Sequence, residues 1–181
     1  MTDLKNYPHQ FLREDVLRET IELLYFSYRD FTEIADKILL QYGYGRAHHR
    51  VLYFVARYPN RSVSDLLSLL KITKQSLSRV LSELVAQEFI IHHHEPRDKR
   101  IKLLSLTQKG QALEQELYLA QKKMIEASFA RTNAQAVKDF RQILLGLIQD
   151  PEHARLFTQE NKPASAWTQS RYIKNKELNC E

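Results

Sequence analysis

Two short amphipathic segments with a three-residue turn between them constrain the fold of this chain more than any other feature. The first spans residues 62–70 and begins with Ser62 and Asp65, which stand three apart as in a capping box, with Asp in place of Glu. The turn ends at Thr73, a residue type that caps helices well. The pattern therefore predicts a helix, a tight turn and a second helix. The second helix has one apolar stripe: Leu77, Val80, Leu81, Leu84 and Val85.

The opposite face of the second helix carries hydrogen-bond donors and no carboxylate: Lys74, Gln75, Ser78, Arg79 and Ser82. Two β-prone runs follow at residues 89–94 and 100–106, around a charged tip, and predict a β-hairpin. The order helix, turn, polar-faced helix, hairpin is the layout of a winged helix-turn-helix.

This layout suits DNA. The major groove of B-DNA admits one α-helix, and the residues that read it must be rich in donors and backed by a core. The first turn and a half of the second helix meets this requirement through Lys74, Gln75, Ser76, Ser78 and Arg79. The hairpin tip presents Arg97, Lys99 and Arg100, which suit phosphates or a narrow minor groove. The alternative is an amphipathic surface helix with no groove to read.

Positive charge is concentrated in the same stretch of the chain. Residues 41–110 hold 12 Lys and Arg against 5 Asp and Glu, a balance of +7. The remaining residues hold 15 basic and 17 acidic side chains, a balance of −2. A basic block between nearly neutral segments is typical of a nucleic-acid surface, although a solvated face with a chance excess of charge gives the same count.

Composition excludes several other classes of protein. With 4 Gly and 5 Pro in 181 residues, a loop-rich sandwich or a disordered chain is disfavoured. The single cysteine, Cys180, excludes an intrachain disulfide and an all-Cys zinc site, and we expect an inert terminal thiol. No apolar run approaches the ~18 residues needed to span a bilayer, and the N-terminus lacks a signal-peptide layout. We therefore expect a cytoplasmic protein without membrane contact.

Helical periodicity flanks the basic block on both sides. Apolar residues recur at helical steps from about Gln10 to Leu40, residues 46–57 read as a second helix, and periodicity returns after Thr107. Thr132 and Gln135 form a second capping box, which predicts another helix that ends before Asp150-Pro151. The predicted units are 10–45, an N-terminal helix; 46–110, the winged helix-turn-helix; 111–149, C-terminal helices; and 150–181, a polar tail.

Three segments resemble the MarR family of bacterial transcription regulators. Asp98-Lys99-Arg100, with Leu106-Thr107 and Gly110, matches the D-x-R…L-T-x-x-G signature of that family. Residues 45–52 look like its second helix and residues 72–80 like its recognition helix, and the likeness covers roughly residues 10–149.

The resemblance implies a mostly α-helical fold with a small β-hairpin wing. It further implies a homodimer in which the helices of 10–45 and 111–149 interlock, and a repressor that binds a palindromic, double-stranded DNA operator. By matching position, Arg100 is the wing arginine that reaches the minor groove or backbone, and Asp98 helps to hold it. Stabilisation of the hairpin turn is the alternative role for Asp98. The expected DNA-binding set is Ser62, Thr73, Lys74, Gln75, Ser76, Ser78, Arg79, Arg97, Asp98, Lys99 and Arg100.

An effector site is also expected. His48 and His49 lie where the family's ligand clefts form, and Tyr25, Tyr28 and Arg29 on the first helix could line the same cleft. An arginine with aromatic neighbours suits a small aromatic or anionic effector that releases DNA. Roles in the core or in an interface are the alternative for these residues.

Metal binding and catalysis are not expected from the sequence. His92-His93-His94 offers at most two ligands on one face of a strand, with no carboxylate or Cys beside them, so we expect no metal and no cofactor. The sequence contains no Gly-rich phosphate loop, nucleophile elbow or H-E-x-x-H helix, so we do not expect an enzyme. A winged-helix protein-interaction module without operator binding is the second candidate, which the donor row and the basic wing disfavour.

Overall fold

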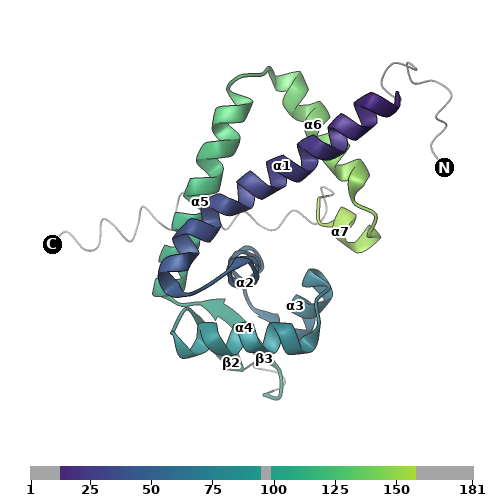
Figure 1. The fold of residues 1–181 in the computed structure, drawn as a ribbon. Helices are drawn as coiled ribbons and strands as arrows, with labels where there is room; N and C mark the ends of the chain where they lie inside the picture. The colour runs from purple at the N-terminus through teal and green to yellow at the C-terminus, as the bar shows by residue number, and fades with distance from the viewer. Residues whose placement is uncertain (1–12, 95–98, 158–181) are drawn as a thin grey trace.

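The computed structural model describes residues 13–94 and 99–157 of the chain. Figure 1 shows α2, α3, α4 and the β-hairpin grouped at one end of the molecule, with α1, α5 and α6 extending away from them. The predicted fold class, mostly α-helical with a small hairpin wing, is confirmed. The elements in chain order are α1 (Glu14–Leu39), a 3-10 helix (Leu40–Tyr42), α2 (Arg46–Arg57), β1 (Arg61–Ser62), α3 (Val63–Leu70), α4 (Lys74–Ala86), β2 (Ile90–His94), β3 (Lys102–Leu106), α5 (Gln108–Phe129), α6 (Ala134–Leu147) and α7 (Pro151–Arg155).

Local capping interactions determine where both helices of the helix-turn-helix begin. The Ser62 hydroxyl accepts a hydrogen bond from the backbone N–H of Asp65, and the Asp65 carboxylate accepts from the backbone N–H of Ser62. Lys71 ends α3 in the left-handed region, with φ of 50°, and turns the chain toward α4. Thr73 then caps α4 by accepting from the backbone N–H of Ser76. Both predicted caps are therefore present.

The core joins the winged module to the long helices. The apolar faces of α3, α4 and β3 meet those of α2, the end of α1 and the first half of α5. Because α2 contributes residues to this core and also contacts α5, α4 rests on a rigid base. The largest fully buried side chains are Phe89, Leu39, Leu52, Leu77, Leu84, Ile90, Leu104, Leu117 and Val51.

The sheet has three strands, in the order β1-β3-β2, and all neighbours are antiparallel. The predicted hairpin corresponds to β2 and β3, where Ile90 pairs with Leu106 and His94 with Lys102. β1 was not predicted. It has two residues, too few to show an alternating pattern, and it exists because Arg61 pairs with Leu104.

One predicted cap is wrong by a single residue. The N-cap of α6 is Asn133, whose side chain accepts from the backbone N–H of Ala136 at 2.9 Å. Thr132 instead donates its hydroxyl to the carbonyl of Phe129, where α5 ends. Thr and Asn both cap helices well, and the structure uses the Asn that follows the predicted Thr.

The long helices keep apolar side chains exposed on a single chain. Ile21 on α1 is 66% exposed and Ile143 on α6 is 62% exposed, and no residue of α6 is buried. α1 buries only Thr32, Ala35 and Leu39. Among the residues that the structure describes, no helix combines the length and the apolar character needed to cross a membrane.

Candidate nucleic-acid interface

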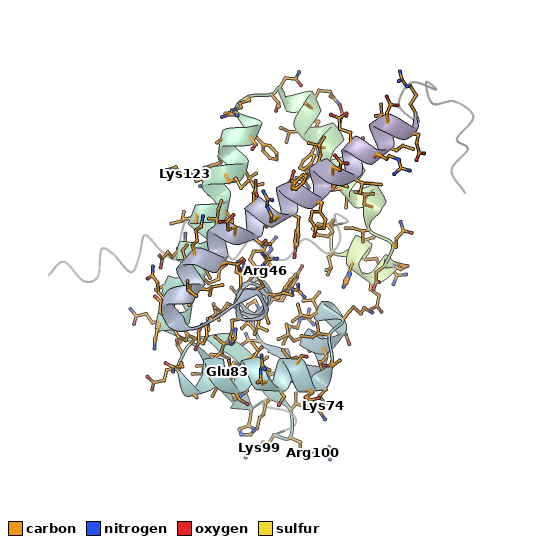
Figure 2. All side chains as sticks on the ribbon, viewed as in Figure 1. Arg46, Lys74, Glu83, Lys99, Arg100 and Lys123 are labelled. Atoms are coloured by element: carbon orange, nitrogen blue, oxygen red, sulfur yellow. The ribbon has the colours of Figure 1, made fainter. Side chains whose placement is uncertain are left out.

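The polar face of α4 is directed away from the core. Its apolar residues, Leu77 and Leu84 among them, are buried, whereas Lys74, Gln75, Ser76, Ser78 and Arg79 are exposed. Figure 2 shows Lys74, Lys99 and Arg100 at the same end of the molecule. The structure thus brings the predicted helix donors and the described wing residues to one surface.

The hydroxyl groups near α4 differ in what they can still donate. The Ser62 hydroxyl donates to the Asp65 carboxylate at 2.9 Å, so its proton is already used beside a negative charge. The Thr73 hydroxyl donates to Oγ of Ser76 at 2.9 Å, which leaves the Ser76 hydroxyl with its own proton to offer. Because phosphate oxygens only accept hydrogen bonds, this arrangement favours Ser76 over Ser62 and Thr73 as a phosphate ligand.

The wing is braced at its base. Asn60 accepts from Ser105 through its side-chain oxygen, which also bonds to Nε2 of His93 at 2.8 Å. Lys99 and Arg100 are exposed beyond this base. Arg97 and Asp98 lie outside the described residues, as does the predicted contact between Asp98 and Arg100.

The L-T-x-x-G part of the signature has a packing role. Thr107 caps α5 by accepting from the backbone N–H of Gly110 at 3.0 Å, and its hydroxyl donates to the carbonyl of Glu88. A Cβ on Gly110 would stand 2.0 Å from the backbone oxygen of Phe89. Glycine is therefore required there, because α5 crosses directly over the chain that enters the wing.

α4 also carries a carboxylate, Glu83, which was not among the predicted functional residues. Glu83 faces α2, where its Oε2 is 2.6 Å from Nε2 of the buried His48. Its Oε1 is 3.6 Å from Nε of Arg79. The four-residue spacing of Arg79 and Glu83 is a visible signal in the sequence. The contact with His48 has no such signal.

None of the five expected effector residues lines the cavity described in the next paragraph, and each has its own surroundings. Tyr25 is 73% exposed on α1, and Tyr28 is also exposed. Arg29 pairs with Asp30 at 2.8 Å. His48 is committed to Glu83, and partial burial lowers the pKa of the neighbouring His49.

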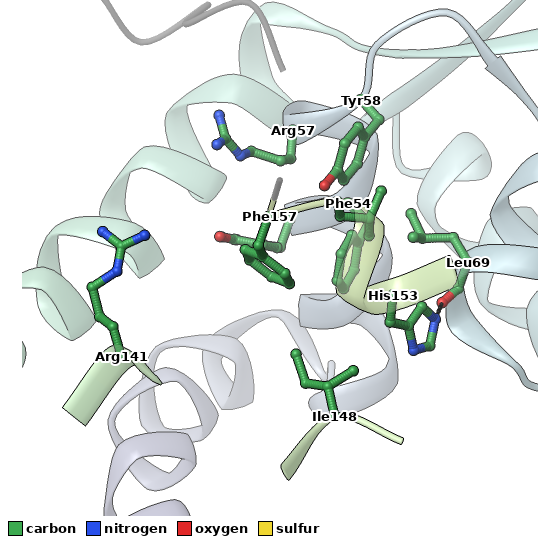
Figure 3. Close-up of a pocket in the computed structure, with 10 residues that line it drawn as sticks. Phe54, Arg57, Tyr58, Leu69, Arg141, Ile148, His153 and Phe157 are labelled. Carbon is green, nitrogen blue, oxygen red and sulfur yellow. Dashed lines mark hydrogen bonds between the residues drawn. The ribbon is translucent and has the colours of Figure 1, made fainter. Parts of the chain in front are cut away.

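A cavity of about 460 Å³ lies elsewhere, between α2 and the segment that follows α6. Figure 3 shows Arg57 and Arg141 on the same side of Phe157. Among the described residues, neither arginine has a carboxylate at ion-pair distance. The cavity is lined by Tyr53, Phe54, Arg57, Tyr58, Leu69, Arg141, Ile148, His153, Leu156 and Phe157.

The histidine run lies along β2. His93 bonds to the side-chain oxygen of Asn60, and His94 donates from Nδ1 to the backbone carbonyl of Lys99. Burial, with help from Lys102 and His93, lowers the pKa of His92. Within residues 13–94 and 99–157, no three His, Cys, Asp or Glu side chains group as metal ligands.

Comparisons with known proteins agree with this geometry. The family model described as MarR family matches residues 42–101. The HTH-type transcriptional regulator PetP of Rhodobacter capsulatus is 44% identical over 145 residues, which cover 80% of this chain and 87% of that protein. The likeness to PetP therefore extends beyond the winged module into the flanking helices.

Solved structures share the fold. Streptococcus pneumoniae FabT in complex with DNA has a TM-score of 0.65 at 17% identity, over 72% of this chain and 94% of that one. Wild-type MarR from E. coli has a TM-score of 0.55 at 19% identity, over 70% of this chain and 95% of that one.

Proposed function

This chain belongs to the MarR family and is a helix-turn-helix transcription regulator, and we propose that it acts as a homodimeric repressor on a two-fold symmetric DNA operator. The observation that carries this proposal is the exposed donor face of α4 beside a basic wing, on a rigid core. We further propose that it works by binding DNA and not as an enzyme, and that it acts in the cytoplasm, with the DNA. A protein-interaction module without operator binding is not favoured by the family.

The exposed apolar stripes of α1 and α6 support dimerisation. Isolated helices with such stripes are unfavourable in water, and a second copy of the same chain offers the same stripes by symmetry. The largest exposures on them include Ile21 and Ile143. Two copies would also double the basic face of the winged module.

Light scattering after size-exclusion chromatography tests the dimer. The wild-type chain is expected at twice its 21.4 kDa mass, and Ile143→Glu at a lower average mass. Gln142→Glu, which adds the same charge one position away, serves as the control. A monomeric wild-type chain would contradict the proposal.

Selection of bound duplexes from random-sequence DNA tests operator binding. The expected product is an enriched motif with two-fold symmetry, bound by two chains per duplex. Failure to enrich any motif would instead support the protein-interaction module.

Release of DNA by a small aromatic or anionic effector completes the proposal, and the cavity beside α2 is its site. Aromatic walls and two arginines without carboxylate partners among the described residues suit a ligand such as salicylate. Salicylate is expected to raise the melting temperature of the wild-type chain more than that of Arg141→Gln. Equal shifts, or none, would exclude this site.

A further inference from the structure

Glu83 connects the buried side of α4 to its DNA-facing side. Its two carboxylate oxygens have different partners, one on α2 and one in α4 itself. Oε2 lies 2.6 Å from Nε2 of His48, whose side chain is 8% exposed. Oε1 lies 3.6 Å from Nε of Arg79, whose side chain is 78% exposed. Figure 2 shows Glu83 on the winged module that also carries Lys74.

His48 is held in one orientation. Its Nδ1 accepts a hydrogen bond from the backbone N–H of Gly45 at 3.2 Å. The ring stacks on Tyr44 with centroids 4.3 Å apart and planes 9° apart. Because Nδ1 accepts, the ring proton is on Nε2, where it is donated to Glu83. The Glu83 carboxylate is therefore anchored by a ring that two further contacts keep from turning.

From this geometry we propose that Glu83 is a positioning residue for Arg79, and that His48 holds Glu83 for that role. The inference rests on the proposed operator binding. An exposed arginine loses rotamer entropy when it binds, and a fixed carboxylate one turn away limits the directions in which it points.

The Glu83 carboxylate also changes which DNA groups Arg79 binds most favourably. Glu83 repels phosphates, so it lowers the attraction of α4 for DNA of any sequence. A base edge that accepts two hydrogen bonds from the guanidinium, such as guanine, still competes for Arg79. Glu83 thereby favours sequence-specific contacts over backbone contacts, in the same way that a repulsive element sharpens specificity in other interfaces.

Fluorescence anisotropy on the selected operator and on a scrambled duplex tests this role. Glu83→Gln keeps the shape of the side chain and removes its charge. We expect tighter binding to scrambled DNA, and a ratio of scrambled to operator Kd that falls about fivefold to tenfold, the low end for one arginine–base pair. Glu88→Gln is the matched control, because Glu88 is an exposed carboxylate of the same module. It should change both affinities alike.

A double-mutant cycle separates positioning from a structural role. In the Arg79→Ala background, Glu83→Gln should leave the ratio unchanged, because no arginine remains to be positioned. His48→Gln should lower the ratio as Glu83→Gln does, and melting temperatures report whether each variant folds. An equal effect of Glu83→Gln with and without Arg79, or equal changes on both duplexes, would overturn the inference. If the wild-type chain itself shows no preference for the operator, it is the proposed function that fails.

Discussion

Lys71 Nζ lies 3.3 Å from Oδ2 of Asp150, and this ion pair ties the turn of the helix-turn-helix to the segment after α6. A second link lies beside it, because Nε2 of His153 bonds to the carbonyl of Leu69 at 2.8 Å. The polar tail predicted from residue 150 thus begins with a short helix, α7, docked on α3. This docking closes one side of the cavity beside α2 and connects it to the turn before α4.

Asp150 has two separable functions in that docking. It caps α7 by accepting from the backbone N–H of Glu152, and it pairs with Lys71. We expect Asp150→Asn to keep the cap and Asp150→Ala to lose both contacts. Hydrogen exchange of the α7 amides should therefore be fastest in Asp150→Ala, intermediate in Asp150→Asn and slowest in the wild-type chain. Identical exchange in all three would show that α7 is held without Asp150.

The same side chain gives the docking a pH dependence. The backbone N–H of Glu152, followed by Lys71, holds the pKa of Asp150 below its usual value of 3.8. A depressed acid pKa stabilises the folded state above the unfolded pKa, and the contribution disappears as the pH falls through the folded value. Protection of the α7 amides should therefore persist at neutral pH and weaken only below about pH 4.

Gly110 is the position least tolerant of a side chain. In Gly110→Ala the new Cβ would overlap the backbone of Phe89, so α5 or the start of the wing must move. We expect a loss of at least about 2 kcal/mol in the free energy of unfolding, measured by urea denaturation. Gly146→Ala on α6 is the control, since a Cβ there meets nothing within 4 Å. That variant should be neutral or more stable by up to about 1 kcal/mol.

Glu114 on α5 should make stability depend on pH. The residue is 2% exposed, and burial raises the pKa of its carboxyl from 4.5 to about 7. Because the folded chain then binds the proton more tightly than the unfolded chain, this contribution to stability is complete below about pH 4.5 and is lost as the pH rises through 7.

Urea midpoints at pH 5 and pH 8 measure that effect. Glu114→Gln removes the titrating group and keeps its size, so its midpoint should fall less between the two pH values than that of the wild-type chain. The two proteins share every other titratable group, so a parallel fall in both would contradict the assignment to Glu114.

Local signals made the winged module predictable. Ser62, Asp65 and Thr73 cap their helices through residues three positions away, so the sequence shows both ends of the turn. The bounds of α2, Arg46–Arg57, also match the prediction, because apolar residues recur at clear helical steps in that segment.

Contacts between distant residues were not predictable. Glu83 and His48 stand 35 positions apart, and the buried Gln121 donates to the carbonyl of Phe31, 90 positions away. Neither partner has a sequence pattern that points to the other, because each contact depends on how two helices cross. The effector site expected around Tyr25 and His48 stays a prediction, and neither residue lines the cavity beside α2 and α7.

Arg100 is expected to bind DNA without reading its sequence. Arg100→Ala should weaken binding to operator and scrambled duplexes by the same factor, and should reduce the slope of log K against log salt by about 1. Lys123 on α5, far from the winged module in Figure 2, provides the control in Lys123→Ala. A loss confined to the operator would instead give Arg100 a role in base recognition.

The ratio of scrambled to operator Kd for the wild-type chain and for Gln75→Ala tests the reading of DNA by α4 most directly. Gln75 is exposed in the first turn of that helix, and its side chain has no part in the core. The wild-type ratio should be about a thousandfold or more, and Gln75→Ala should lower it by the equivalent of about 1–3 kcal/mol at unchanged melting temperature. A wild-type ratio near one, or equal losses on both duplexes for Gln75→Ala, would contradict base reading by α4.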